Sequence, residues 1–388
     1  MSSEAPAADE RWQRVRRVLA VRLDNVGDVL MTTPALAAIR QSVPGARLTL
    51  LTSSAGAAVA ACVREIDDVM CFDASWAKPH AADGADLGCT EQQLIDRLRG
   101  QFDAAVIFTV CTQSALPAAL VCRMAGIPLR LGHSRENPYG LLTHWVRDTD
   151  EVRTGMRHEV QRQLALVATV GYAVDDDRLR LHLSVPQRRH ARTLLHDAGV
   201  PMTRPYFVVH PGASAASRRY PAARFGSAAD AIAARSGCLP VFTGDASEQP
   251  LIDEARRCMS QPSVTLAGRV GLAELAALIG DARLLLSNNT GPAHIAAAMG
   301  TPVAVLYALT NPQHTPWRVR AHVLSHDVPC RHCLKSECPQ GHHDCLLKVQ
   351  PDDVVRAASA LLRPLPSEAP VVRTGARQPQ FETQGSTA

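Results

Sequence analysis

The fold is decided by residues 287–300, which read Ser-Asn-Asn-Thr-Gly-Pro-Ala-His-Ile-Ala-Ala-Ala-Met-Gly. The leucine-rich residues 283–286 before them predict a strand, Gly291 permits a tight turn, and Pro292 suits the first position of a helix. Free N–H groups at such a helix start carry partial positive charge and point outward. The stretch predicts either a phosphate seat, which would fit a nucleotide-sugar pyrophosphate, or a plain connection of a doubly wound α/β fold.

The composition is that of a soluble globular protein with room for two domains: 388 residues, 46% hydrophobic and 20% charged. A net charge of +4 is too small to indicate nucleic-acid binding. The sequence shows neither an apolar run long enough to span a membrane nor a signal-peptide pattern. We therefore predict a cytoplasmic protein.

Several arginines near the start could contact an anionic membrane surface or form a solvated flank of the first strand: Arg11, Arg14, Arg16, Arg17 and Arg22. Peripheral contact with the cytoplasmic face of the inner membrane is therefore left open.

Short β-branched or leucine-rich runs alternate with alanine-rich helical segments, which predicts two α/β domains with mostly parallel sheets. The alternation stops in a charged, proline-punctuated segment, within which 187–198 has helical character, and starts again at residue 206. The predicted division is a disordered start (1–14), an N-terminal domain (15–185), a linker region (186–204), a C-terminal domain (205–362) and a disordered tail (363–388).

Two carboxylates follow the first predicted strand (18–23), in the run Arg22-Leu-Asp-Asn-Val-Gly-Asp-Val. Open α/β sheets bind ligands beyond the carboxyl ends of their strands, so Asp28 is the candidate general base and Asp24 the reserve. An aspartate at a helix start is also a common cap that requires no chemistry. The helix terminus would lower the pKa of Asp28, so proton removal would have to be concerted with attack by a hydroxyl.

A small-residue loop follows the predicted strand 206–210 and ends in two arginines before a proline-opened helix. Gly212, Arg218 and Arg219 in this loop suit a diphosphate, because guanidinium groups pair with phosphate oxygens in a bidentate manner. Asp245 and Glu248 follow the next strand, where an acid can accept hydrogen bonds from ribose hydroxyls. A solvated loop with surface arginines, and a helix cap at Asp245, are the simpler alternatives.

These motifs resemble glycosyltransferase family 9, the ADP-heptose:lipopolysaccharide heptosyltransferases, over most of residues 17–362. The most specific matches are Asp-x-x-Gly-Asp with Thr-x-Pro at 24–34, His-Pro-Gly with Arg-Arg-Tyr-Pro at 210–221, and Asn-Thr-Gly-Pro-Ala-His at 289–294. All three occur in the order and at the spacing that the family shows.

The resemblance implies a GT-B architecture, in which two Rossmann-like domains face each other across a cleft. It implies inverting transfer without a catalytic cofactor, with Asp28 as base and Arg218 at the donor phosphates. The turn that holds the pyrophosphate would be formed by Asn289, Thr290, Gly291 and His294. Two departures are an arginine at 218, where lysine is usual, and Asn288-Asn289, where many members carry Asn-Asp; the second puts the donor sugar in doubt.

Four of the eleven cysteines cluster in the loop 330–345, as Cys330, Cys333, Cys338 and Cys345. Their density predicts a structural zinc or iron site, and packed reduced thiols are the alternative. His133 follows a short predicted strand and could contact the acceptor, although a surface turn explains it equally well.

The sequence therefore predicts a heptosyltransferase that uses ADP-heptose, or a related nucleotide sugar, and a lipopolysaccharide core or related glycan or protein acceptor. The alternatives are another GT-B enzyme, such as a nucleotide-sugar epimerase, and a non-catalytic scaffold that uses the cysteine loop.

Overall fold

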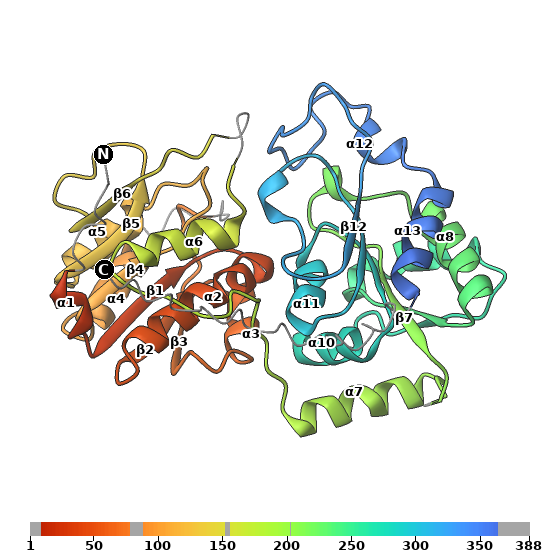
Figure 1. Ribbon diagram of the computed structural model, residues 1–388, viewed down its shortest axis with the longest axis horizontal. Helices are drawn as coiled ribbons and strands as arrows, with labels where there is room; N and C mark the ends of the chain where they lie inside the picture. Colours follow the sequence, from red (N-terminus) through yellow and green to blue (C-terminus); the bar gives the residue numbers. More distant parts are fainter. Residues whose placement is uncertain (1–8, 78–87, 152–155, 202, 364–388) are drawn as a thin grey trace, which may run out of the picture.

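The computed structural model describes residues 9–77, 88–151, 156–201 and 203–363, which form two α/β halves side by side (Figure 1). Each half is built on a six-stranded, wholly parallel sheet. The strand orders are β3-β2-β1-β4-β5-β6 and β12-β11-β10-β7-β8-β9. Counted within its own half, each sheet has the order 3-2-1-4-5-6, so the predicted α/β, GT-B type architecture is confirmed.

The first sheet consists of short strands whose central members are buried. They are β1 Arg17–Arg22, β2 Arg47–Thr52, β3 Asp68–Cys71, β4 Ala104–Ile107, β5 Leu129–Ser134 and β6 His144–Arg147. Its helices are α1 Glu10–Gln13, α2 Val26–Ser42, α3 Ser54–Ala60, α4 Cys89–Leu98, α5 Leu116–Met124 and α6 Glu159–Ala168. Every residue of β4 is buried, as a central strand covered on both faces requires.

The second sheet repeats this design. Its strands are β7 Tyr206–His210, β8 Leu239–Phe242, β9 Val264–Thr265, β10 Leu285–Asn288, β11 Val303–Leu306 and β12 Ala321–Leu324. Its α-helices are α8 Ala222–Ser236, α9 Gln249–Arg257, α10 Leu272–Asp281, α11 Gly291–Met299, α12 Asp344–Leu347 and α13 Pro351–Leu362. Short 3₁₀ turns occupy Ala216–Arg218, Ala246–Glu248 and Pro312–His314.

Helix α7, Val185–Asp197, occupies most of the predicted linker region and lies along one side of the second half (Figure 1). Two arginines of α7 pair with Asp281 of α10, Arg192 at 3.1 Å and Arg188 at 3.9 Å, and His190 contacts Glu274 at 3.2 Å. The connection between the halves is therefore a packed helix.

The start of the chain differs from its prediction. Residues 10–13 fall within the predicted disordered segment 1–14, but they form α1, because Trp12 is fully buried against the rings of His144 and Tyr172. The predicted tail 363–388 lies outside the described residues except for Arg363.

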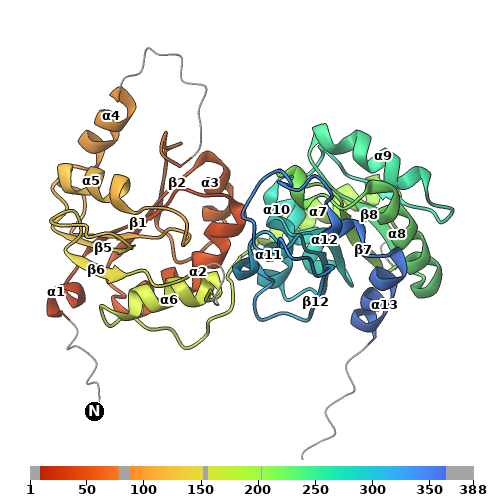
Figure 2. The ribbon, with the colours of Figure 1, turned by 90° about the horizontal axis from the view of Figure 1, so that it is seen from above.

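Helix α2 follows β1 after only three residues. It starts at Val26 and includes Pro34 in its interior, and residues 29–39 are all buried. The first turn of α2 therefore lies directly beyond β1, and it packs against α11 of the other half at the junction seen in Figure 2. No helix in the described part of the chain is long and apolar enough to cross a membrane.

Candidate active site

A buried cluster of charges forms where β1 ends and α2 begins. Arg22, the last residue of β1, is fully buried and pairs with three carboxylates. Its Nε lies 2.9 Å from Asp24 Oδ2, and its Nη2 lies 3.4 Å from Asp28 Oδ1 and 3.0 Å from Glu159 Oε1. The interpretation of Arg22 as part of an exposed arginine flank is therefore wrong. Its guanidinium is buried, and the attraction of three carboxylates offsets the desolvation cost of its charge.

The two aspartates of this cluster are pushed in opposite directions. Burial raises the pKa of Asp24, and the nearby charge of Arg22 only partly opposes it. Burial also acts against ionisation of Asp28, but Arg22, His314, the Asn25 N–H and His294 together hold its pKa below the usual value. Asp28 is thus the ionised member of the pair and Asp24 the one that holds a proton more readily.

Asp28 also caps helix α2, which was the alternative role predicted for it from the sequence. The backbone N–H of Asn25 donates to Asp28 Oδ2 at 3.2 Å, at the N-terminus of α2. The other carboxylate oxygen faces Arg22, so capping and a chemical role are compatible in the same side chain. Asp24 Oδ1 accepts a hydrogen bond from Gln113 Nε2 at 2.6 Å.

In the second half, the loops after β7 and β8 lie against each other. A Cβ built on Gly212 would lie 1.8 Å from Glu248 Oε1, so only glycine allows this carboxylate so close to the loop. Asp245 caps the 3₁₀ turn before α9 by accepting from the Glu248 N–H at 3.0 Å, and the Asp245 N–H donates to Glu248 Oε2 at 3.0 Å. The cap alternative for Asp245 is therefore present, and burial raises the pKa of Glu248.

The two arginines of the β7 loop differ in their surroundings. Arg219 Nε donates to the Ala213 carbonyl at 2.7 Å, which closes the loop on itself. Arg218 instead acts electrostatically on His294 and Tyr307, so its charge lies at the start of α11, and its buried Nε has no hydrogen-bond partner among the described residues. Of the two arginines, Arg218 is therefore the one with a free N–H donor that could bind an anion.

The predicted phosphate turn joins β10 to α11. Asn289 is buried, Thr290 is the N-cap in extended conformation, and Gly291 is the first helical residue. His294, one turn later, is buried and its pKa is lowered to about 3, chiefly by burial. The imidazole is therefore neutral at ordinary pH and the positive charge at this helix start comes from its N–H groups and Arg218.

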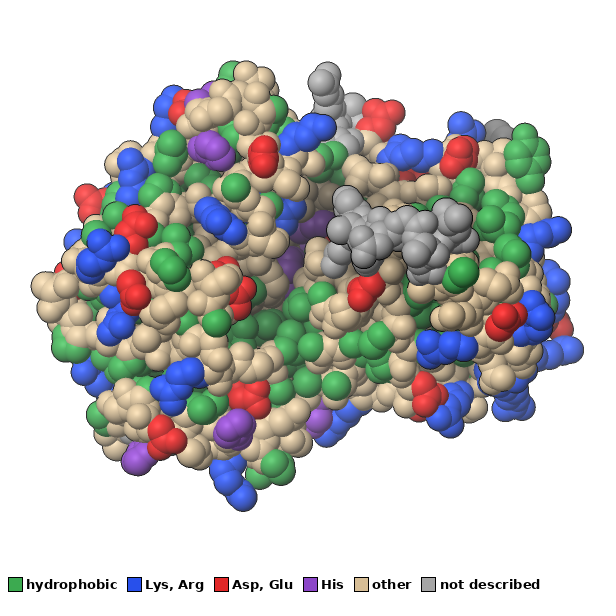
Figure 3. Space-filling view, turned by 180° about the vertical axis from the view of Figure 1, so that it is seen from behind, with side chains coloured by type: hydrophobic (Ala, Val, Ile, Leu, Met, Phe, Trp, Pro, Cys, Tyr) green, Lys and Arg blue, Asp and Glu red, His purple; other side chains and the backbone are tan. Residues whose placement is uncertain are grey.

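The two halves meet with these sites facing each other. A Cβ on Gly27 would lie 2.7 Å from His294 Cδ2, and one on Gly291 would lie 3.4 Å from Val26. The first turn of α2, which carries Asp28, therefore adjoins the first turn of α11. Figure 3 shows a hollow between the halves with histidine side chains inside it.

The candidate acceptor side contains two adjoining pockets at the carboxyl edge of the first sheet. One, of about 230 Å³, is lined by Asp24, Trp76 and Gln113 among others, and the second includes His133. His133 lies within β5 and is buried, so its placement after a strand, and the surface-turn alternative, are both wrong. Burial lowers its pKa to about 4.

The four loop cysteines lie in one neighbourhood, since the thiols of the other three contribute to the raised pKa of Cys345, after burial. Nevertheless, no group of three or more His, Cys, Asp or Glu residues within the described ranges could hold a metal ion. The predicted structural metal site at Cys330, Cys333, Cys338 and Cys345 is therefore not formed as these residues lie. The loop packs on the loop after β7 instead: the Ser217 N–H donates to the Ser336 carbonyl at 3.0 Å.

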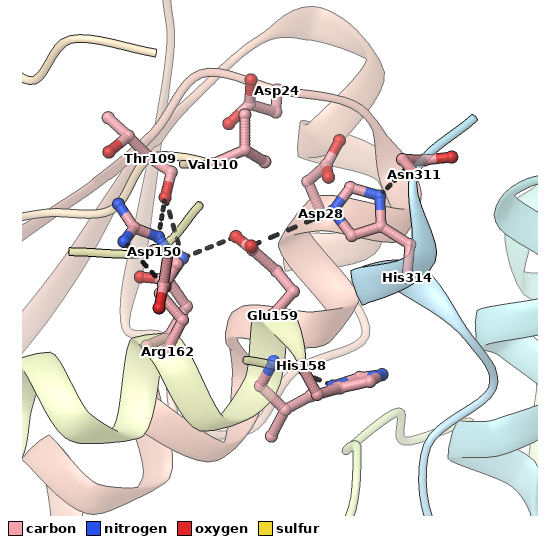
Figure 4. A network of polar contacts seen from close by, with 12 residues as sticks. Asp24, Asp28, Thr109, Val110, Asp150, His158, Glu159, Arg162, Asn311 and His314 are labelled. Atoms are coloured by element: carbon pink, nitrogen blue, oxygen red, sulfur yellow. Dashed lines mark hydrogen bonds and ion pairs between the residues drawn. The ribbon is translucent and has the colours of Figure 1, made fainter. Parts of the chain in front are cut away.

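Sequence reasoning missed the roles of Arg22, Glu159 and His314, which meet in one network of ion pairs. Figure 4 shows Glu159 and His314 in this network. Arg22 ends an otherwise apolar strand, and a charge there is a signal of a buried ion pair. His314 lies in the loop after β11, at the sheet edge where ligands bind, and that placement could have marked it. Nothing in the local sequence distinguishes Glu159.

Two facing Rossmann-like halves of this strand order are the architecture of a GT-B glycosyltransferase. The family description "Glycosyltransferase family 9 (heptosyltransferase)" matches residues 92–343, and the chain belongs to that family.

Similar proteins agree with this assignment. Lipooligosaccharide heptosyltransferase 2 of Haemophilus ducreyi is 25% identical over 378 residues, which cover 89% of this chain and 99% of that protein. A solved family 9 glycosyltransferase from Veillonella parvula has a TM-score of 0.74 at 22% identity, covering 89% of this chain and 97% of that one. The Escherichia coli ADP-heptose LPS heptosyltransferase II has a TM-score of 0.68 at 21% identity, covering 89% and 98%.

Proposed function

We propose that this enzyme transfers heptose from ADP-heptose to a hydroxyl of a lipopolysaccharide core or related glycan, with inversion and without a catalytic metal. The observation that carries the proposal is that the ionised Asp28 adjoins the helix start and the arginine suited to a sugar nucleotide's pyrophosphate. Family membership supports heptose as the sugar, and the relatives named for ADP-heptose and LPS support the donor and the acceptor.

In the proposed reaction, the acceptor oxygen bonds to the anomeric carbon on the face opposite the phosphate. The carbon–oxygen bond to ADP breaks, and Asp28 takes the hydroxyl proton, so charge and atoms balance. ADP leaves with its negative charge compensated by Arg218 and the N–H groups of Gly291 and its neighbours, which need no metal to do so. Gly212, Arg219, Asp245, Glu248, Asn289, Thr290 and His294 line the donor side of this proposal.

The acceptor would enter over the first half. One pocket is lined by Asp24 and the other includes His133, and Asp24 shares its ion-pair partner Arg22 with Asp28, which supports binding of the acceptor sugar near the proposed base. We further propose that the reaction takes place in the cytoplasm, with a lipid-linked acceptor presented at the membrane surface.

The decisive experiment combines nucleotide binding with turnover. Thermal stabilisation should be selective for ADP and ADP-heptose over GDP and UDP, by about 2.7 kcal/mol at 100 times the dissociation constant. Mass spectrometry should then detect a heptosylated acceptor and free ADP. Turnover of the nucleotide sugar without any acceptor would instead support an epimerase, and the absence of both binding and turnover would support a scaffold.

A further inference from the structure

One histidine of the second half reaches into the charged network of the first half. His314 ends the 3₁₀ turn Pro312–His314, in the loop that follows β11. Its Nε2 lies 3.9 Å from Glu159 Oε2, and its ring contributes to lowering the pKa of Asp28. In Figure 4 the imidazole points from its loop toward both carboxylates; apart from Asn311 of the same loop, the other labelled residues come from the first half.

The hydrogen bonds around this ring assign its proton. Thr310 Oγ1 donates to Asn311 Oδ1 at 2.7 Å, and the Nδ2 of the same amide lies toward the histidine. That Nδ2 lies 2.7 Å from His314 Nδ1 and donates to it. The neutral ring therefore carries its hydrogen on Nε2, the atom that faces Glu159.

The donor and the acceptor across this gap are both buried and both unsatisfied. His314 Nε2 and Glu159 Oε2 have no hydrogen-bond partner among the described residues, and the Glu159 side chain is fully buried. The other oxygen of Glu159 is occupied by Arg22 Nη2 at 3.0 Å and Gln163 Nε2 at 2.6 Å. Buried polar groups are normally paired, and shortening this gap by about 1 Å would give an ordinary hydrogen bond.

We propose that His314 is a positioning residue that donates from Nε2 to Glu159 Oε2 when the two halves close around the donor. The bond fixes Glu159, and Glu159 fixes Arg22, whose Nη2 also contacts Asp28. The catalytic aspartate is thereby held in its reactive orientation only while the donor half is in place. This inference rests on the proposed function, in which Asp28 is the base.

Other titratable groups surround His314, and they determine which variant tests its contact with Glu159. The titratable side chains around His314 are Asp28 and Glu159, on α2 and α6, and the histidines His158 and His294. His158 Nε2 lies 2.9 Å from the Thr315 carbonyl and its ring lies over Trp317 at 4.4 Å, so it belongs to a separate contact between the halves. A variant of His158 would therefore test the packing of the two halves, whereas a variant of His314 tests the contact with Glu159.

The test compares His314→Ala and His314→Gln with the wild type in the ADP-heptose transfer assay. The alanine variant should lower kcat about 10- to 100-fold while the dissociation constant for ADP changes less than about threefold. Glutamine keeps an N–H donor close to the position of Nε2 and should restore most of the activity.

The matched control is His196→Ala, since His196 lies on α7 with a side chain that is 75% exposed. A double-mutant cycle with Glu159→Gln should be strongly non-additive, because both changes remove the same bond. Should Glu159→Gln fail to fold, the alanine–glutamine comparison at position 314 decides alone.

Three results would overturn the inference while leaving the proposed function intact: full activity of His314→Ala, equal loss with glutamine, or an additive cycle. A wild type without heptosyl transfer would overturn the proposed function and this inference with it.

Discussion

The two halves share one strand order, yet they prepare their facing edges in opposite ways. The first half holds its charge already paired: Arg22 is buried among Asp24, Asp28 and Glu159. The second half holds two histidines with lowered pKa values, the partly buried His210 and the buried His294, beside an arginine whose Nε has no hydrogen-bond partner in the described part of the chain. The carboxylates of the first half thus have their counter-charge within that half, whereas the edge of the second half is left short of negative charge.

The difference matches what each edge would do under the proposed function. A base must keep its charge state, which an ion-pair network supplies without a ligand. A seat for a dianionic leaving group must have unneutralised donors, and protonated histidines in a dry site would have required counter-charges of their own. At corresponding edges of the same fold, the charges of the first half are thus paired within the protein, whereas the N–H donors of the second half would be paired by a bound anion.

The largest expected effect comes from removing the base. Asp28→Asn should lower kcat by about 10²–10⁴ while ADP binding survives, because the amide cannot accept the proton. Steady-state kinetics and calorimetric ADP titration measure the two quantities. The matched control is Asp24→Asn, the same substitution at the other aspartate of the cluster, with an expected loss of less than about tenfold because Asp24 is not the proposed base. A larger loss at Asp24 would exchange the two roles.

Removing Arg22 from the ion-pair network should lower the unfolding free energy of the first half. Arg22→Met leaves three carboxylates without their buried cation and should cost about 3–5 kcal/mol of unfolding free energy. Urea denaturation at neutral pH measures it. Arg17→Met, on the same strand but in an exposed pair with Asp103 at 2.8 Å, should cost less than about 1 kcal/mol. Similar losses for the two variants would contradict a special role of the cluster.

Acid should destabilise the second half, because the histidines that are neutral in the folded protein take up protons more readily in the unfolded chain. Burial lowers the pKa of His210 to about 4, and its unfolded value is about 6.5. The unfolded chain therefore binds a proton between these values and the native chain does not, so this stability is complete above pH 6.5 and is lost as the pH falls. The loss from His210 is about 2 kcal/mol between pH 7 and pH 5.

Urea denaturation at the two pH values tests this sign. The variant His210→Gln should lose about 2 kcal/mol less than the wild type on acidification. An equal loss would mean that His210 titrates alike in both states.

The unpaired arginine should matter for donor binding alone. Arg218→Ala should raise the dissociation constant for ADP about tenfold, the cost of one charged phosphate contact, and should weaken acceptor binding less. Isothermal titration with ADP measures it, and Arg235→Ala, an exposed arginine of α8, is the control. Equal weakening of donor and acceptor would mean that Arg218 only supports the fold.

The smallest effect should follow metal removal. Because the four loop thiols do not form a ligand set as they lie, dialysis against a chelator under reducing conditions should shift the melting temperature by less than about 1 °C. Elemental analysis should find no stoichiometric zinc or iron. One tightly held metal ion whose removal unfolds the loop would reverse this conclusion.

Much of the molecule is legible in its sequence. The alternation of apolar strands and alanine-rich helices, with Gly291 and Pro292 at a turn, predicts the two-half α/β design because periodicity and turn chemistry act over a few residues. The candidates Asp28, Gly212 and Arg218 are equally local, since each follows a strand end. The sequence by itself thus determined the architecture and the edges at which chemistry could occur.

Only the tertiary structure decided which charges meet. Arg22 and Glu159 are 137 residues apart, His314 comes from the other half, and burial of Trp12 orders a segment that composition alone assigns to disorder. Burial and long-range pairing fix the protonation of Asp24, Asp28 and His294, because a pKa depends on the surrounding charges and on exclusion of water. Those surroundings arise only when strands distant in the chain are brought to one edge.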